Sequence, residues 1–127
     1  MRDRTAQFAE LKGKTFASVA GCEKDSDCII FTCTDGTTYE LYHEQECCED
    51  VHVNDVVGNV EDLIGTEILV ADEVSSDEFV STQPVYDFHS ETWTFYKLAT
   101  VKGYVDIRWY GTSNGYYSES VAFARTS

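Results

Sequence analysis

The chain has 127 residues, of which 43% are hydrophobic and 13% aromatic. This composition is sufficient for one domain with its own hydrophobic core and excludes an intrinsically disordered chain. The 23 acidic residues outnumber the 9 basic ones, which gives a formal net charge of −14 at pH 7. Because so acidic a surface repels phosphate backbones and anionic membranes, we expect neither nucleic acid nor a membrane as a partner.

The sequence also bears on the cellular compartment. No stretch approaches the roughly 20 apolar residues of a membrane-spanning helix. The first residues lack the apolar segment of a secretory signal. The cysteines number five, and an odd count favours reduced thiols over a disulfide framework. We therefore expect a cytoplasmic protein.

The N-terminal part predicts one short helix and then strands. Apolar residues within 5–11 are compatible with a short amphipathic helix. Residues 15–22, 28–34 and 39–42 are rich in β-branched and aromatic side chains, which favours strands. The pair Asp35-Gly36 lies between the last two of these strands and predicts a hairpin turn.

The middle of the chain is less regular. Residues 51–53 are expected to be extended, and residues 59–64 to form a short helix with Asn59 as its N-cap. Residues 67–74 predict a strand. Residues 75–90 show no clear period, so we expect a loop that carries function.

The C-terminal third has the clearest strand pattern. Residues 92–101, 104–110 and 116–124 predict three consecutive strands joined by Gly-containing turns, which would form an antiparallel meander. We therefore expect one domain covering residues 1–127. Its predicted fold class is α+β, a mostly antiparallel β-sheet with an N-terminal helix and one short internal helix.

Cysteine and histidine residues are concentrated between positions 22 and 52. They are Cys22, Cys28, Cys33, His43, Cys47, Cys48 and His52. Their spacings differ from the paired ligands, two to four residues apart, of structural zinc sites. A nucleophilic cysteine is disfavoured because acidic neighbours raise a thiol pKa. No nucleotide-enzyme or hydrolase motif is present. We expect no metal, no cofactor and no catalytic residues, and thus a protein that binds rather than catalyses.

One predicted strand combines aromatic and cationic side chains. Alternation along residues 104–110 places Arg108 on the same face as Tyr104, Asp106 and Tyr110, opposite a predicted core face. A guanidinium group suits phosphate, and aromatic rings stack on nucleobases. The alternative is a surface ion pair between Arg108 and Asp106 among ordinary cross-strand contacts. Both interpretations remain open from the residues alone.

Two segments carry a family resemblance. The runs HVNDVVGNVEDLIG and TWTFYKLATVKGYVDIRWYGTSNGYYSESV resemble a family of small phage proteins that includes the anti-Thoeris sponge proteins. The resemblance implies an anti-defence protein of the host cytoplasm. Such a protein binds a cyclic ADP-ribose isomer without cleaving it, so that the host effector stays inactive. Cyclic di- or trinucleotides are implied as ligands of a second site.

The resemblance also implies site residues. Arg108 would hold phosphate, Thr92 or Asn114 would contact ribose, and Lys24 would serve the second site. The implied stacking residues are Phe79, Phe88 and Trp93. We expect a homo-oligomer, either a symmetric dimer or a hexamer built as a trimer of dimers, because a small chain often builds a deep cleft between protomers. Two other functions stay open: an acidic protein-binding inhibitor or nucleic-acid mimic, and an enzyme acting on a nucleotide.

Overall fold

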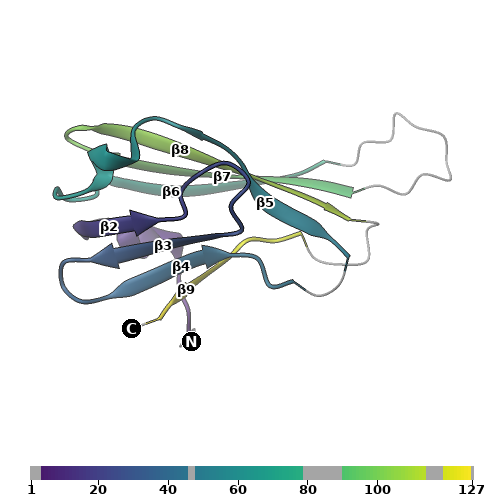
Figure 1. Cartoon of the computed structure of the whole chain (residues 1–127), viewed down its shortest axis with the longest axis horizontal. Coiled ribbons are helices and arrows are strands. Elements are labelled where there is room, and N and C mark those ends of the chain that lie inside the picture. Colours follow the sequence, from purple (N-terminus) through teal and green to yellow (C-terminus); the bar gives the residue numbers. More distant parts are fainter. Residues whose placement is uncertain (1–3, 46–47, 79–89, 114–118, 127) are drawn as a thin grey trace, which may run out of the picture.

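The computed structural model describes residues 4–45, 48–78, 90–113 and 119–126, and within them it contains nine strands and two short 3₁₀-helices (Figure 1). The strands are β1 Arg4–Thr5, β2 Phe16–Ala20, β3 Cys28–Cys33, β4 Thr38–Tyr42, β5 Asp50–Val57, β6 Val70–Glu78, β7 Ser90–Thr100, β8 Gly103–Ser113 and β9 Ala122–Arg125. The 3₁₀-helices are η1 Phe8–Leu11 and η2 Val60–Leu63. No helix in these ranges is long and apolar enough to cross a membrane.

The strands form two antiparallel sheets that pack against each other. One sheet has five strands in the order β1-β9-β4-β3-β2, and the other has four in the order β5-β8-β7-β6. In Figure 1 the five-stranded sheet lies on one side of the four-stranded sheet. A continuous hydrophobic core joins them, and it includes the fully buried Phe31, Leu98 and Trp109.

The predicted hairpin at Asp35-Gly36 is confirmed. Strands β3 and β4 pair in antiparallel register up to Thr32 and Thr38. Gly36 has a φ of 91°, which a residue without Cβ adopts at little cost. The Asp35 carboxylate accepts hydrogen bonds from the backbone N–H and the hydroxyl of Thr37, at 3.0 and 2.6 Å. Local side-chain chemistry thus fixes this turn.

The α+β prediction is wrong, because the described residues contain no α-helix. The predicted N-terminal helix is replaced by strand β1 and the single 3₁₀ turn η1, and the internal one by η2. Phe8 and Leu11, three residues apart, are both buried by one 3₁₀ turn. Gly13 then adopts a φ of 91° and donates a backbone hydrogen bond to Ile68 at 2.8 Å, so the chain leaves the helical path after one turn. The capping role of Asn59 is confirmed, since its side chain accepts from the Glu61 N–H at 3.0 Å.

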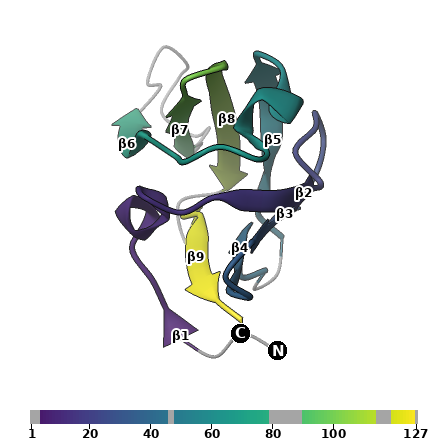
Figure 2. The same cartoon turned by 90° about the vertical axis from the view of Figure 1, so that its left-hand side faces the viewer.

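The prediction of a C-terminal three-stranded meander is only partly correct. Strands β7 and β8 form the predicted hairpin, but β9 leaves this sheet and pairs with β4 and β1 (Figure 2). Phe123 of β9 stacks on Tyr39 of β4, with ring centroids 5.3 Å apart and planes at 4°. This buried contact stabilises the packing of β9 in the five-stranded sheet. The third strand beside β7 is β6, which extends to Glu78 and so occupies part of the predicted loop.

Candidate functional site

The outer face of the four-stranded sheet, which is the face turned away from the five-stranded sheet, carries the candidate site. Along β8, Val105, Ile107 and Trp109 are fully buried in the core. Alternate residues therefore point outward, as the sequence predicts. The outward residues of β7 and β8 stand in cross-strand register: Trp93 pairs with Tyr110, Phe95 with Arg108, and Lys97 with Asp106.

Three rings and one guanidinium group meet on the outer face, and we call these four side chains the Arg108 cluster. Trp93 and Tyr110 have ring centroids 4.5 Å apart. The His52 ring of β5 and the Tyr110 ring have centroids 6.2 Å apart in a T-shaped arrangement. The guanidinium carbon of Arg108 lies 5.3 Å from the Trp93 ring centroid, within the range of a cation–π contact. The cluster thus spans three adjacent strands.

Strand β5 holds Arg108 in place from the edge of the sheet. A register shift between Val53 and Asp55 interrupts the pairing of β5 with β8. Beside it, the Arg108 Nε–H donates to Asn54 Oδ1 at 2.9 Å, and Arg108 Nη2 lies 3.8 Å from Asp55 Oδ2. No hydrogen bond joins the Nη groups to any residue that the structure describes. The guanidinium is therefore oriented by one edge, and its outer fork remains available to an acceptor.

The sequence allowed a surface ion pair between Arg108 and Asp106, but Arg108 has a different partner in the structure. The partner of Arg108 is Asp55 on the neighbouring strand rather than Asp106 on its own strand. The side chains of Arg108 and Asp55 are 43% and 50% exposed, so water screens their attraction. The pair therefore contributes little to stability and leaves the arginine accessible to a ligand.

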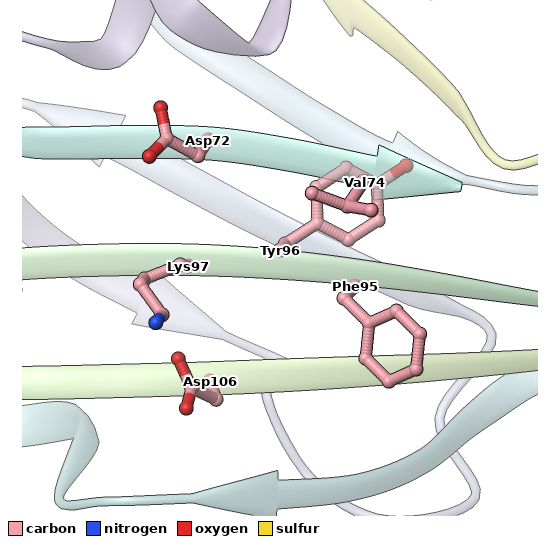
Figure 3. Close-up of a pocket in the computed structure, with 6 residues that line it drawn as sticks. All are labelled: Asp72, Val74, Phe95, Tyr96, Lys97 and Asp106. Carbon is pink, nitrogen blue, oxygen red and sulfur yellow. The ribbon is translucent and has the colours of Figure 1, made fainter. Parts of the chain in front are cut away.

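A pocket with a volume of about 470 Å³ adjoins the Arg108 cluster (Figure 3). It is lined by Asp72, Val74, Phe95, Tyr96, Lys97 and Asp106, from strands β6, β7 and β8. Val74, on the edge strand β6, and Phe95, on the inner strand β7, are 62% and 42% exposed, which is high for apolar side chains. Figure 3 shows Lys97 between the two aspartates, with its ammonium group directed toward Asp106. Apolar and charged groups thus share one concave surface.

The structure brings together only some of the residues implied by the family resemblance. Arg108 and Trp93 are in contact, as the proposed phosphate and stacking residues would be. Thr92 faces the core side instead, where its hydroxyl donates to the buried Glu119 at 2.7 Å. Lys24 is exposed in the turn between β2 and β3, which pairs with the β5 edge through Asp25 N–H and Val53 O at 2.8 Å. Phe79, Phe88 and Asn114 lie outside the described residues.

Sequence reasoning missed the contribution of strand β5. This strand adds His52 to the cluster and supplies Asn54 and Asp55 as polar partners of Arg108. The alternation of Val51, His52 and Val53 would have placed His52 on an outward face. The pairing of β5 with β8 is not encoded in that local pattern.

The cysteine and histidine residues of the described chain occupy separate sites. Cys22, Cys28 and Cys33 are free thiols, whereas Cys48 is disulfide-bonded. Burial raises the pKa of Cys22 to about 12, so its thiol stays protonated. The His43 side chain is buried, and its Nδ1–H donates to the Ser120 carbonyl while its Nε2 lies 2.7 Å from the Glu49 carboxylate. Among the described residues, no group of three or more His, Cys, Asp or Glu is placed to hold a metal ion.

Comparison with known proteins identifies the family but no activity. No curated protein and no solved structure matches the chain significantly. One family model covers residues 9–123, which is most of the chain. The chain therefore belongs to the family described as a domain of unknown function (DUF7448).

Proposed function

We propose that the protein binds and sequesters a small nucleotide on the outer face of its four-stranded sheet, without cleaving it. The observation that carries this proposal is the Arg108 guanidinium, 5.3 Å from the Trp93 ring centroid and oriented by Asn54. A planar fork whose Nη groups make no hydrogen bond to any described residue suits a phosphate, and the adjoining indole and phenol rings suit a base. The ligand class we favour, from the family resemblance, is a cyclic ADP-ribose isomer.

The net charge of −14 opposes an anionic ligand, so the local geometry must compensate. Charges farther away than the Debye length, which is about 8 Å at physiological ionic strength, are largely screened. Within this distance, the Asp55 carboxylate lies 3.8 Å from Arg108 and competes with a phosphate. The two Nη groups would bind phosphate through paired hydrogen bonds, which are stronger and more directional than this ion pair.

Sequestration adds two requirements to binding. A protein that withholds a signal in the host cytoplasm must bind it with a dissociation constant of about 1 nM. This corresponds to a binding free energy of roughly −12 kcal/mol. An open sheet face covers only one side of a ligand, whereas tight small-molecule sites bury most of the ligand surface. We therefore include in the proposal a second copy of the chain, which closes over the ligand in a homo-oligomer.

The test is calorimetric titration with a cyclic ADP-ribose isomer, followed by heat release and chromatography of the ligand. We expect tight binding and recovery of the intact ligand. Arg108→Ala should lower the affinity by about 30-fold or more, whereas Arg125→Ala, on β9 of the other sheet, should leave it unchanged. Asp55→Asn removes the competing carboxylate and should raise the affinity by about 2- to 5-fold. Unaltered binding by Arg108→Ala would refute the assignment of this site.

A second candidate function is favoured by the apolar side chains on the same face. Val74, Phe95 and Tyr104 are between 42% and 62% exposed, and exposed aromatic residues are enriched where proteins meet. In a strongly acidic chain such a surface suits a basic protein partner. For this function, Arg108→Ala would be silent, and charge reversal at acidic surface positions would abolish the association.

A further inference from the structure

The pocket beside the Arg108 cluster has a lining of unusual composition. It combines two carboxylates, one ammonium group and one exposed aromatic ring, supplied by Asp72, Asp106, Lys97 and Phe95. We infer that this pocket is a sugar subsite, in which the aspartates accept hydrogen bonds from ring hydroxyls, Lys97 donates one, and Phe95 packs against the C–H face. The inference rests on the proposed function where the sugar is the ribose of a bound nucleotide.

The first support is an unmet hydrogen-bond acceptor. Asp106 Oδ1 is buried and has no hydrogen-bond partner in the described chain. Buried carboxylate oxygens are normally paired, since an unpaired one loses its interaction with water without compensation. Lys97 points toward Asp106 in Figure 3, but it makes no ion pair with any described residue. A hydroxyl group entering the pocket would supply the missing donor after a small shift of the Asp106 side chain.

The second support is the charge balance of the lining. An anionic ligand would meet Asp72 and Asp106 within a protein of net charge −14. A cationic ligand would meet the ammonium group of Lys97. A neutral ring bearing several hydroxyl groups avoids both conflicts, because each hydroxyl both donates and accepts. The lining therefore disfavours an anion and offers hydrogen-bond partners to a neutral polyol.

The third support is the apolar wall. Phe95 and Val74 are cross-strand partners and present adjoining apolar surface to the pocket. Their exposure has no role in the core, which lies on the opposite face of the sheet. The C–H face of a sugar ring packs on such a surface while its hydroxyls reach the flanking polar groups. One ring can thus satisfy both halves of the lining.

The pocket also lies at a suitable distance from Arg108. Asp106 and Arg108 are two residues apart on the same face of β8, which separates their Cα atoms by about 7 Å. Phe95 is the cross-strand partner of Arg108. A nucleotide with its phosphate on the arginine fork could therefore extend its ribose over Phe95 toward Asp106.

The experiment compares ribose-containing and deoxyribose-containing ligands. The wild-type chain and its Asp106→Asn variant are titrated with a cyclic ADP-ribose isomer and with its 2′-deoxy analogue. We expect loss of the hydroxyl to weaken wild-type binding by roughly 10-fold or more, but to have a smaller effect in Asp106→Asn, because a neutral amide oxygen accepts a weaker hydrogen bond than a carboxylate. Asp27→Asn, in the β2–β3 turn, is the matched control and should behave as wild type. Circular dichroism confirms that each variant is folded.

A second arm separates the source of the sugar from the chemistry of the pocket. Ribose, glucose and galactose are titrated alone and followed by nuclear magnetic resonance of labelled Phe95 and Lys97. If the protein binds the nucleotide with an affinity that changes neither on loss of the 2′-hydroxyl nor in Asp106→Asn, the sugar subsite is refuted and the proposed function stands. Saccharide binding that depends on Asp106, without nucleotide binding, would support the subsite and refute the proposed function. Binding of neither ligand would refute both.

Discussion

Replacement of Phe8 by alanine tests how the two sheets are held together. Phe8 is 2% exposed and lies in η1, between the sheets. Its ring centroid is 6.5 Å from that of Phe31 and 5.4 Å from that of Phe123, both in the five-stranded sheet. It is also 4.7 Å from the ring of Tyr96 in the four-stranded sheet. Phe8 therefore contacts both layers of the core.

The expected loss follows from the burial of the ring. A Phe→Ala change at a fully packed core position costs about 3–5 kcal/mol, because it removes transfer free energy and leaves a cavity. With a urea m-value of about 2 kcal/mol per molar for a domain of this size, the unfolding midpoint should fall by roughly 1.5–2.5 M. Phe8→Leu fills most of the space and should lose only about 1–2 kcal/mol.

Phe95→Ala is the matched control, because the same atoms are removed from a ring that is 42% exposed on the outer face. This substitution should lower the free energy of unfolding by about 1 kcal/mol or less, because alanine has a lower strand propensity and the Phe95 ring is only partly buried. Urea unfolding followed by tryptophan fluorescence measures all three variants. Equal midpoints for Phe8→Ala and Phe95→Ala would show that η1 does not clamp the sheets. If Phe8→Ala fails to fold, the unfolding midpoints of Phe8→Leu and Phe95→Ala are compared instead. A lower midpoint for Phe8→Leu would support the role of Phe8 between the sheets.

Two further predictions concern polar contacts. The Lys14 ammonium, followed by the hydroxyl and backbone N–H of Thr37, lowers the pKa of Asp35 below its ordinary value of 3.8. A depressed carboxyl pKa stabilises the fold above the unfolded value, and this stability is lost as the pH falls below about 4. The urea midpoint of Asp35→Asn should therefore decline less steeply toward about pH 2.5 than that of wild type, while Asp27→Asn should follow wild type. Thr92→Val removes a hydroxyl donor from the buried Glu119 and should cost about 1–3 kcal/mol in urea unfolding at neutral pH. Thr92→Ser should restore most of that stability, and equal losses for both variants would contradict the role of the hydroxyl.

Features set by neighbouring residues could be predicted from the sequence. Alternation along β8 predicted which residues are buried, and Trp109 and Ile107 are indeed fully enclosed. The turn at Asp35-Gly36 and the capping role of Asn59 were equally predictable. In each case the determining interactions join residues only a few positions apart. Their physics therefore holds in almost any tertiary context.

The predictions were wrong where a local sequence pattern was compatible with two conformations or two strand pairings. A segment of seven residues is too short to stabilise an α-helix by itself, so tertiary contacts decide its conformation. Here, Phe8 and Leu11 enter the core from a 3₁₀ turn, and the residues before them pair with β9. Similarly, residues 116–124 were predicted to continue the β7–β8 meander. Phe123 instead packs on Tyr39, which belongs to the other sheet.

The sequence alone therefore determined an acidic, aromatic-rich chain with strands of known inward and outward faces. It also determined that Arg108 lies on an outward face. Only the tertiary structure decided which groups meet that arginine, because strand pairing joins residues far apart in the chain. Asn54 is 54 residues away from Arg108, and it reaches the guanidinium beside the register shift that interrupts the pairing of β5 with β8. The pocket has the same origin, since Asp72, Lys97 and Asp106 come together through the register of three strands.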